Sequence, residues 1–382
     1  MSTHRYPVLI ACMLVTFVLG SVHAFSVFLV PLEQNLDLPR SEVSLIYSWT
    51  LVAITISVLV GYRIYSRLPA WSMMALTCAG AAGGLCLAAL AESWWTLFFG
   101  YSLMFGLANG VGYGYGLQLV GRELPRIRGF AMGAVTASYA LGSILFAKVF
   151  AWRIETVGVE AALFALMGAV LVCGVVAALL LFVEHSRFDE LPQTADSGFE
   201  SRKVLQFWFA YMCSVFAGLM AIGHAAGIVL WKGLDNEMAT LGAMMIGVGS
   251  ALGGFLAGWL IDRWPMTRFL VGLPLLAAAA MLLIQPVDAA IGTIGLLTLV
   301  GFSYGSIIAV YPVAISSYFG AAGPRAYGQV FTAWGFAGLV APWVAGLFYD
   351  RGNDYSAALF VAALIAVVSA VTAALCRFER VA

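Results

Sequence analysis

The chain has 382 residues, of which 62% are hydrophobic and 10% are charged, and its 19 basic and 19 acidic residues give a formal net charge of zero. Soluble domains carry about 25% charged residues, so this composition excludes an ordinary soluble protein. The zero net charge also gives no support for a nucleic-acid partner.

Several apolar runs in the sequence are long enough to cross a bilayer. Residues 161–183 and 355–376 contain no charged residue, and each exceeds the ~20 residues that a membrane-spanning helix needs. The hydropathy pattern predicts an all-α membrane protein with twelve transmembrane helices. In chain order we expect them at residues 6–30, 43–65, 69–91, 94–119, 127–150, 160–184, 204–231, 238–261, 266–287, 290–318, 325–348 and 355–376.

The placement of basic residues predicts the orientation. With a cytoplasmic N-terminus, 14 of the 19 basic residues fall in inner loops and tails. This asymmetry satisfies the positive-inside rule. We therefore expect a multi-pass protein of the cell inner membrane with both termini in the cytoplasm.

The longest polar stretch, residues 185–203, divides the predicted spans into two groups of six. Features recur on either side of it, including His23 with His224. We expect an N-terminal six-helix bundle at 1–184, a cytoplasmic linker at 185–203 and a pseudo-symmetric C-terminal six-helix bundle at 204–382. A duplicated unit of this kind is typical of secondary transporters.

Glycines repeat at short, helix-compatible spacing within several predicted spans. Such spacing lets helix backbones approach closely in lipid, where no hydrophobic effect drives helices together. Two interpretations stay open, namely tight packing alone or helices that also bend or slide during transport. The glycines concerned are Gly106, Gly110, Gly114, Gly129, Gly133, Gly249, Gly253 and Gly254.

The loop after the eighth predicted span carries GWLIDR (258–263), followed by Arg268. This stretch resembles the GxLxDR loop motif of the major facilitator superfamily, in the position where that family has it. The copy in the first half, GYRIYSR (61–67), has Tyr65 where the motif has aspartate. The resemblance implies that a cytoplasmic charge latch is stronger in the second half.

Three residues are candidates for this cytoplasmic gate: Asp262, Arg263 and Arg325. A carboxylate at Asp262 can face the start of span eleven, near Pro324 and Arg325. There the helix dipole and the guanidinium of Arg325 would stabilise it.

Within that superfamily, residues 109–133 and 318–350 resemble the oxalate/formate antiporter and monocarboxylate porter branch. Members that carry dicarboxylates have a basic residue in span eleven and an arginine in span eight. Here the corresponding positions hold Trp334, or a neighbour, and Gly254. Because an unpaired carboxylate is costly to desolvate, we do not expect a dianionic substrate.

No carboxylate is expected well inside a span, so the deepest ionisable candidates are His23 and His224. A polar group deep in a bilayer is a functional hypothesis, and histidine suits proton coupling because its pKa lies near physiological pH. The alternative is a neutral imidazole that neighbouring helices satisfy.

Aromatic and polar residues in the middle of the spans are the other candidates for substrate contact. Tyrosine and tryptophan inside a bundle need partners for their OH and NH groups, and a solute cavity supplies them. The alternative for each is packing. The candidates are Trp49, Asn109, Tyr113, Tyr139, Tyr304, Tyr311 and Trp334.

Together these patterns predict a secondary active transporter that works by alternating access. The expected substrate is a small neutral or monoanionic organic metabolite, such as a planar flavin-type vitamin, and import is the expected direction. The alternative is a proton-coupled or exchanging transporter of small monocarboxylates. The sequence holds no GxxxxGK[ST] phosphate loop and no enzyme signature. We expect no cofactor or metal, protons and the lipid bilayer as partners beside the substrate, and function as a monomer.

Overall fold

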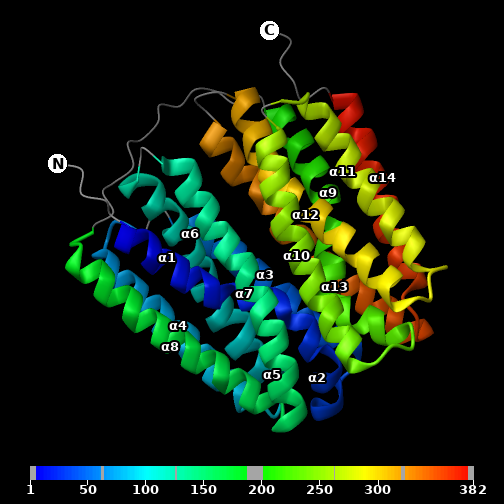
Figure 1. Cartoon of the computed structure of the whole chain (residues 1–382), viewed down its shortest axis with the longest axis horizontal. Coiled ribbons are helices and arrows are strands. Elements are labelled where there is room, and N and C mark those ends of the chain that lie inside the picture. The colour runs from blue at the N-terminus through cyan, green and yellow to red at the C-terminus, as the bar shows by residue number, and fades with distance from the viewer. Residues whose placement is uncertain are drawn as a thin grey trace. The chain divides into compact units, whose positions relative to one another are not determined.

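The structure is a computed structural model, and it describes residues 6–61, 64–124, 127–186, 201–261, 263–319 and 323–376. All regular secondary structure in these ranges is helical (Figure 1). Eleven helices of the described part are long and apolar enough to cross a membrane. The stretch expected as the fourth span is also helical, but it is built from three consecutive elements: α5 (Trp94–Leu97), η2 (Phe98–Phe105) and α6 (Gly106–Glu123).

The contacts between residues divide the chain into two compact units. Unit 1 comprises Met1–Asp37 and Trp49–Pro192, and unit 2 comprises Leu38–Ser48 and Gln193–Ala382. The division therefore cuts one helix, α3 (Arg40–Gly61), whose first turns cluster with unit 2 and whose remainder clusters with unit 1.

The first span of unit 1 changes its helix type along its length. It begins as α1 (Tyr6–Leu19), continues as the 3₁₀ segment η1 (Gly20–Phe28) and ends as α2 (Leu29–Leu36). Pro31 follows the predicted end of this span, yet the helix continues beyond it. Because α2 begins at Leu29, Pro31 lies in a first helical turn, where its missing N–H is tolerated.

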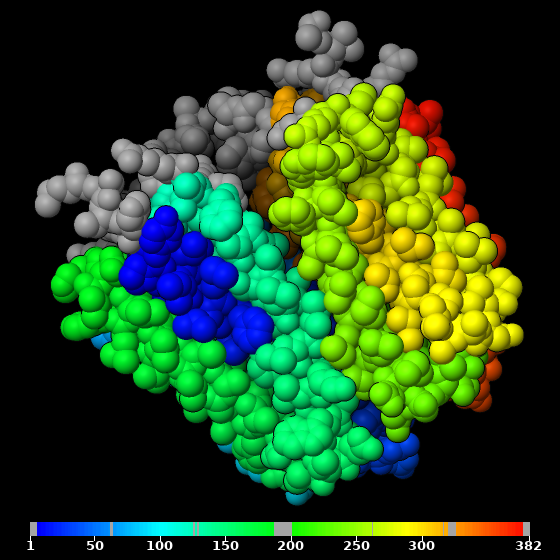
Figure 2. Space-filling model, viewed as in Figure 1, coloured from blue at the N-terminus to red at the C-terminus, as the bar shows by residue number. Residues whose placement is uncertain are grey.

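Besides α5, η2, α6 and the later part of α3, the helices of unit 1 are α4 (Ala70–Ala89), α7 (Arg128–Thr156) and α8 (Val159–Val183). α1 contacts α6, α7 and α8, and it lies beside α7 and α8 in Figures 1 and 2. α4 lies beside α8 (Figure 1).

The outer face of α8 has the character expected of a helix in hydrocarbon. Val172, Val175, Leu179 and Val183 recur at helical spacing and each is more than half exposed. On a soluble protein such an apolar stripe would be an aggregation liability. In a bilayer it faces acyl chains.

Unit 2 is arranged around α9 (Ser201–Trp231), which is the most buried helix of the described spans. It contacts the other five helices of the unit. These are α10 (Asn236–Leu260), α11 (Met266–Ile284), α12 (Ala290–Phe319), α13 (Gly323–Gly352) and α14 (Ser356–Cys376).

Glycines fix the contact between α10 and α12. A methyl group added at Gly249 or Gly253 would collide with the backbone of α12, at Thr298 and Phe302 respectively. Gly301 and Gly305 face the backbone of α10 in the same way. The two backbones touch because both helices lack side chains there, which is the tight packing that small residues permit in lipid.

Candidate functional site

Four of the predicted substrate residues lie together in unit 1, and we call them the His23 cluster: His23, Asn109, Tyr113 and Tyr139. The Tyr139 hydroxyl donates to Asn109 Oδ1 at 2.9 Å. The Tyr139 ring lies edge-on to His23, with centroids 5.6 Å apart, and 5.0 Å from the ring of Tyr113. The cluster therefore joins η1, α6 and α7.

The position of the His23 cluster is fixed where the backbones of the first span and α7 approach each other closely at two points. A methyl group at Gly20 would fall on the backbone of Tyr139, and one at Gly142 would fall on the carbonyl of Phe17. Asn109, which is fully buried, donates from Nδ2 to the Leu19 carbonyl at 2.7 Å. This bond ties α6 to the junction where the first span changes from α-helix to 3₁₀ helix.

Trp49 lies elsewhere in unit 1. Its ring contacts Phe98 edge-on, with centroids 6.1 Å apart, and the side chain is 38% exposed. The structure thus gives Trp49 an aromatic neighbour that the sequence did not indicate.

In unit 2, Tyr304, Phe331 and Trp334 form an aromatic group that we call the Trp334 cluster. The indole Nε1 of Trp334 donates to the Tyr304 hydroxyl at 2.9 Å, and the ring of Phe331 stacks on the indole with an interplanar angle of 9°. A methyl group at Gly218 would collide with the ring of Tyr304. Gly218 on α9 therefore makes room for the tyrosine of α12.

Tyr311 belongs to a different, fully buried network. Its hydroxyl lies 3.1 Å from Ser214 Oγ, which lies 2.6 Å from Ser369 Oγ. Ser369 in turn donates to the carbonyl of Ala210 at 2.9 Å. This chain of hydroxyls links α12, α9 and α14 and satisfies polar groups inside the bundle.

His224 is fully buried, and both ring nitrogens have partners. Nε2 lies 2.8 Å from the carbonyl of Pro342 and 3.2 Å from Ser44 Oγ, and Nδ1 lies 2.8 Å from the hydroxyl of Tyr355. Because a carbonyl only accepts, Nε2 carries the hydrogen, and Nδ1 accepts from Tyr355. This pattern fits a neutral imidazole.

The network around His224 extends to two charged residues, Arg40 and Asp350. The guanidinium of Arg40 donates to the Tyr355 hydroxyl at 3.2 Å and lies 3.6 Å above the ring of Tyr349. Asp350 accepts from the backbone N–H groups of Arg40 and Ser41, one on each carboxylate oxygen and each at 2.9 Å. The sequence singled out none of these residues except His224.

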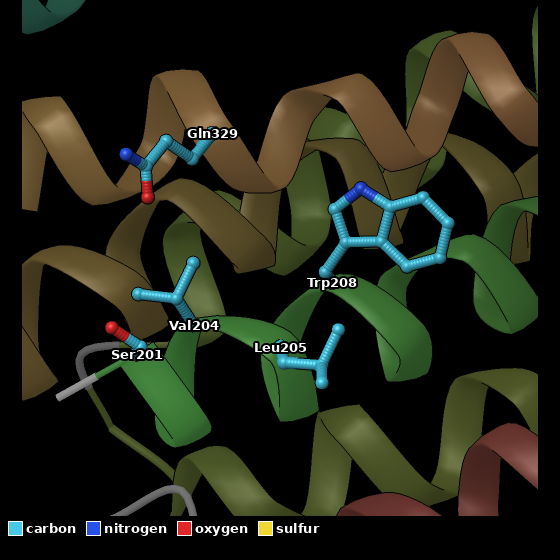
Figure 3. A pocket seen from close by; sticks show the side chains of 5 residues that line it. All are labelled: Ser201, Val204, Leu205, Trp208 and Gln329. Carbon is cyan, nitrogen blue, oxygen red and sulfur yellow. The ribbon is translucent and has the colours of Figure 1, made fainter.

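A separate open hollow of about 340 Å³ lies where α9 begins. Its lining is Ser201, Val204, Leu205 and Trp208 on α9 and Gln329 on α13 (Figure 3). The lining is mostly apolar and includes none of the residues that the sequence predicts to contact substrate. We assign no substrate to it.

A family model described as Major Facilitator Superfamily matches residues 9–342, which is most of the chain. The chain belongs to the major facilitator superfamily. It is thus a multi-pass membrane transporter and not an enzyme.

Three relatives are similar over much of the sequence. The uncharacterized MFS-type transporter YhjX of Escherichia coli is 25% identical over 347 residues, covering 88% of this chain and 86% of the relative. The oxalate:formate antiporter of Oxalobacter formigenes is 27% identical over 60% of this chain and 57% of its own length. Monocarboxylate transporter 11 of Mus musculus is 28% identical over 73% and 66%.

Solved structures share the fold. A D-xylose-proton symporter has a TM-score of 0.74 at 13% identity, covering 99% of this chain and 98% of its own. A bacterial homolog of the human lysosomal transporter Spinster, in an inward-facing and unoccupied conformation, has a TM-score of 0.69 at 15% identity, covering 99% and 97%. These likenesses establish the major facilitator fold and leave the substrate open.

The expected gate at Asp262, Arg263 and Arg325 lies only partly within the described residues. Asp262 lies outside the described residues, as does the side chain of Arg325. The guanidinium of Arg263 lies 3.8 Å above the ring of Trp259. Tyr65, at the aspartate position of the first-half copy, is fully buried and packs edge-on against Tyr115 with centroids 5.2 Å apart.

Proposed function

We propose that this transporter carries a small organic solute with at most one negative charge, and that a small monocarboxylate is the first candidate. The observation that supports it is the makeup of the two clusters. His23, Asn109, Tyr113 and Tyr139 in unit 1 contain no carboxylate, ammonium or guanidinium group, and neither does the Trp334 cluster of unit 2.

The net charge of a solute decides whether such a site can bind it. A dianion that leaves water needs compensating positive charge, because an unpaired carboxylate is very costly to bury. The clusters offer one group that can carry a positive charge, the imidazole of His23. A protonated His23 beside one carboxylate is electroneutral, so a single negative charge can be compensated and two cannot.

The names of two relatives, the oxalate:formate antiporter and monocarboxylate transporter 11, support carboxylates as the substrate class. A planar aromatic nutrient such as a flavin-type vitamin is the second candidate. It is favoured by the aromatic makeup of the Trp334 cluster, in which the ring of Phe331 stacks on the indole of Trp334. Import is the proposed direction for both, with the proton gradient as the driving force.

Purified protein in liposomes tests the substrate class. Under an inward proton gradient, we expect uptake of labelled formate, lactate or pyruvate to rise several-fold over uptake without a gradient, and oxalate and riboflavin to give background counts. His23→Ala should lose the stimulation by the gradient because it removes the only side chain of the clusters that can become a cation. His185→Ala, at an exposed histidine, is the matched control. Oxalate uptake equal to that of the monoanions would contradict the proposal, and gradient-stimulated uptake by His23→Ala would assign His23 a structural role.

For the whole protein we propose two six-helix bundles at 1–184 and 204–382, joined by a cytoplasmic linker at 185–203 and working as a monomer by alternating access. We also propose an inner-membrane location with both termini in the cytoplasm. The distribution of basic residues supports this orientation.

A reporter that is active only in the periplasm should give no signal when fused after Lys203 and a strong signal when fused after Asp354. The reverse pattern would overturn the orientation.

A further inference from the structure

We propose that Arg40 and Asp350 are gating residues of the transport cycle, because they hold the first turns of α3 in a dock that must open and close. The dock consists of Arg40, Ser44, His224, Tyr349, Asp350 and Tyr355 and lies within unit 2. The proposal rests on the proposed alternating-access function, in which the two units move relative to each other.

The division of α3 is the first observation. Its residues up to Ser48 cluster with unit 2, and its residues from Trp49 cluster with unit 1. Yet α3 runs unbroken from Arg40 to Gly61, with neither proline nor glycine before its last residue. Sharp bends in helices are almost always found at such residues or at bulges. A helix that cannot bend between two moving units has to leave one of them.

The contacts of the dock are the second observation, because they are polar and easily exchanged for water. The carboxylate of Asp350 receives the first N–H groups of α3, at Arg40 and Ser41, and so occupies the positive end of the helix dipole. Ser44 Oγ donates to the Arg40 carbonyl at 2.6 Å and accepts from His224. Each of these contacts is a hydrogen bond that water can replace when the dock opens.

The fit of the backbones is the third observation. A methyl group at Gly346 would collide with the backbone of Ser41 and Arg40, and one at Gly223 would press against the ring of Tyr47 and against Pro342. α3 therefore lies directly on α13 and α9, with glycine on the receiving side.

Asp350→Asn tests the gate, since it keeps the size of the side chain but removes its charge and one acceptor oxygen. The matched control is Asp354→Asn. Asp354 accepts from the N–H of Ser356 at 2.8 Å and so caps α14 locally. Both variants are made in full-length protein that carries Ser44→Cys, with the six native cysteines (Cys12, Cys78, Cys86, Cys173, Cys213 and Cys376) replaced by alanine.

The main measurement is the rate at which a membrane-impermeant maleimide labels the cysteine introduced by Ser44→Cys. Substrate uptake and the melting temperature are measured as well. Ser44 is 1% exposed, so labelling requires that α3 leaves the dock. We expect slow labelling with the native Asp350, labelling at least five-fold faster in Asp350→Asn, and no change in Asp354→Asn. Melting temperatures of the two variants should agree within a few degrees.

Two outcomes would contradict the proposal that Arg40 and Asp350 are gating residues. One is a sulfur at position 44 that stays unlabelled in Asp350→Asn while substrate uptake proceeds at the wild-type rate, since transport would then occur with the dock closed. The other is equal acceleration in Asp350→Asn and Asp354→Asn, which indicates general loosening. Both leave the substrate proposal untouched, because that proposal is tested by uptake alone.

Discussion

Replacing Gly253 by alanine is expected to destabilise the protein strongly, by separating α10 from α12. The added methyl group would collide with the carbonyl of Phe302, which is backbone and cannot rotate away. Overpacking of this kind costs about 1–3 kcal/mol and occasionally more, which exceeds the roughly 0.5–1 kcal/mol that alanine gains over glycine in a helix. We expect a melting temperature in detergent at least 5 °C below that of the native protein, and a loss of the monodisperse peak in size-exclusion chromatography.

Gly258→Ala is the matched control for this experiment. It lies in the same helix, α10, and a methyl group there meets nothing within 4 Å. It should therefore show only the gain in helix propensity and leave the melting temperature unchanged or slightly raised. Equal melting temperatures for the two variants would mean that α10 and α12 do not pack through Gly253.

Asn109→Asp is expected to abolish transport and to lower stability, although the two side chains have nearly the same shape. The amide donates to the Leu19 carbonyl and accepts from Tyr139, so it needs both a donor and an acceptor. A carboxylate loses the donor and places an unpaired charge at a fully buried position, at a cost of about 3 kcal/mol or more. Uptake in liposomes should fall by at least ten-fold.

The same change at an exposed site separates this effect from a general one. Asn236 begins α10 and is exposed, so Asn236→Asp adds a negative charge at a helix N-terminus, where it is favourable. We expect normal uptake and an unchanged or slightly higher melting temperature. If Asn109→Asp behaves like this control, the bond to Leu19 does not hold the His23 cluster in place.

The sequence predicted the spans well because length and hydropathy are strongly constrained in lipid. The largest differences are at the ends of the first and fifth spans, where the helices continue to Leu36 and Thr156. Apolar character fades there, and backbone hydrogen bonding decides the end instead. The change to 3₁₀ helix at Gly20 also left no mark in the hydropathy, because it depends on contacts with α7.

The glycine pattern predicted close packing but not its partners. Gly249 and Gly253 indicate a small-residue face on α10, and only the structure identifies Thr298 and Phe302 opposite them. Likewise, Tyr304 and Tyr311 look alike in the sequence, seven residues apart on α12. Tyr304 bonds to Trp334, whereas Tyr311 bonds to a chain of serines. The partners differ because different helices face the two tyrosines.

Arg40 and Asp350 could not have been paired from the sequence. They are 310 positions apart, and each reads as an ordinary charged residue at the end of a helix. The contact depends on tertiary structure that brings the start of α3 to the end of α13. His224 was found because a histidine inside an apolar span is conspicuous, whereas its partners were ordinary residues.

The nine residues of η1 also set the length of the first span and the directions in which the side chains on either side of η1 point. A 3₁₀ helix rises about 2.0 Å per residue with three residues per turn, against 1.5 Å and 3.6 residues in an α-helix. If Gly20–Phe28 rewound into an α-helix, the span would shorten by about 4–5 Å, and α2 would rotate by about half a turn relative to α1. His23 lies within this segment, so rewinding would swing its imidazole to another side of the span. The first span can thus behave as a screw, in which a change of winding becomes both a translation and a rotation.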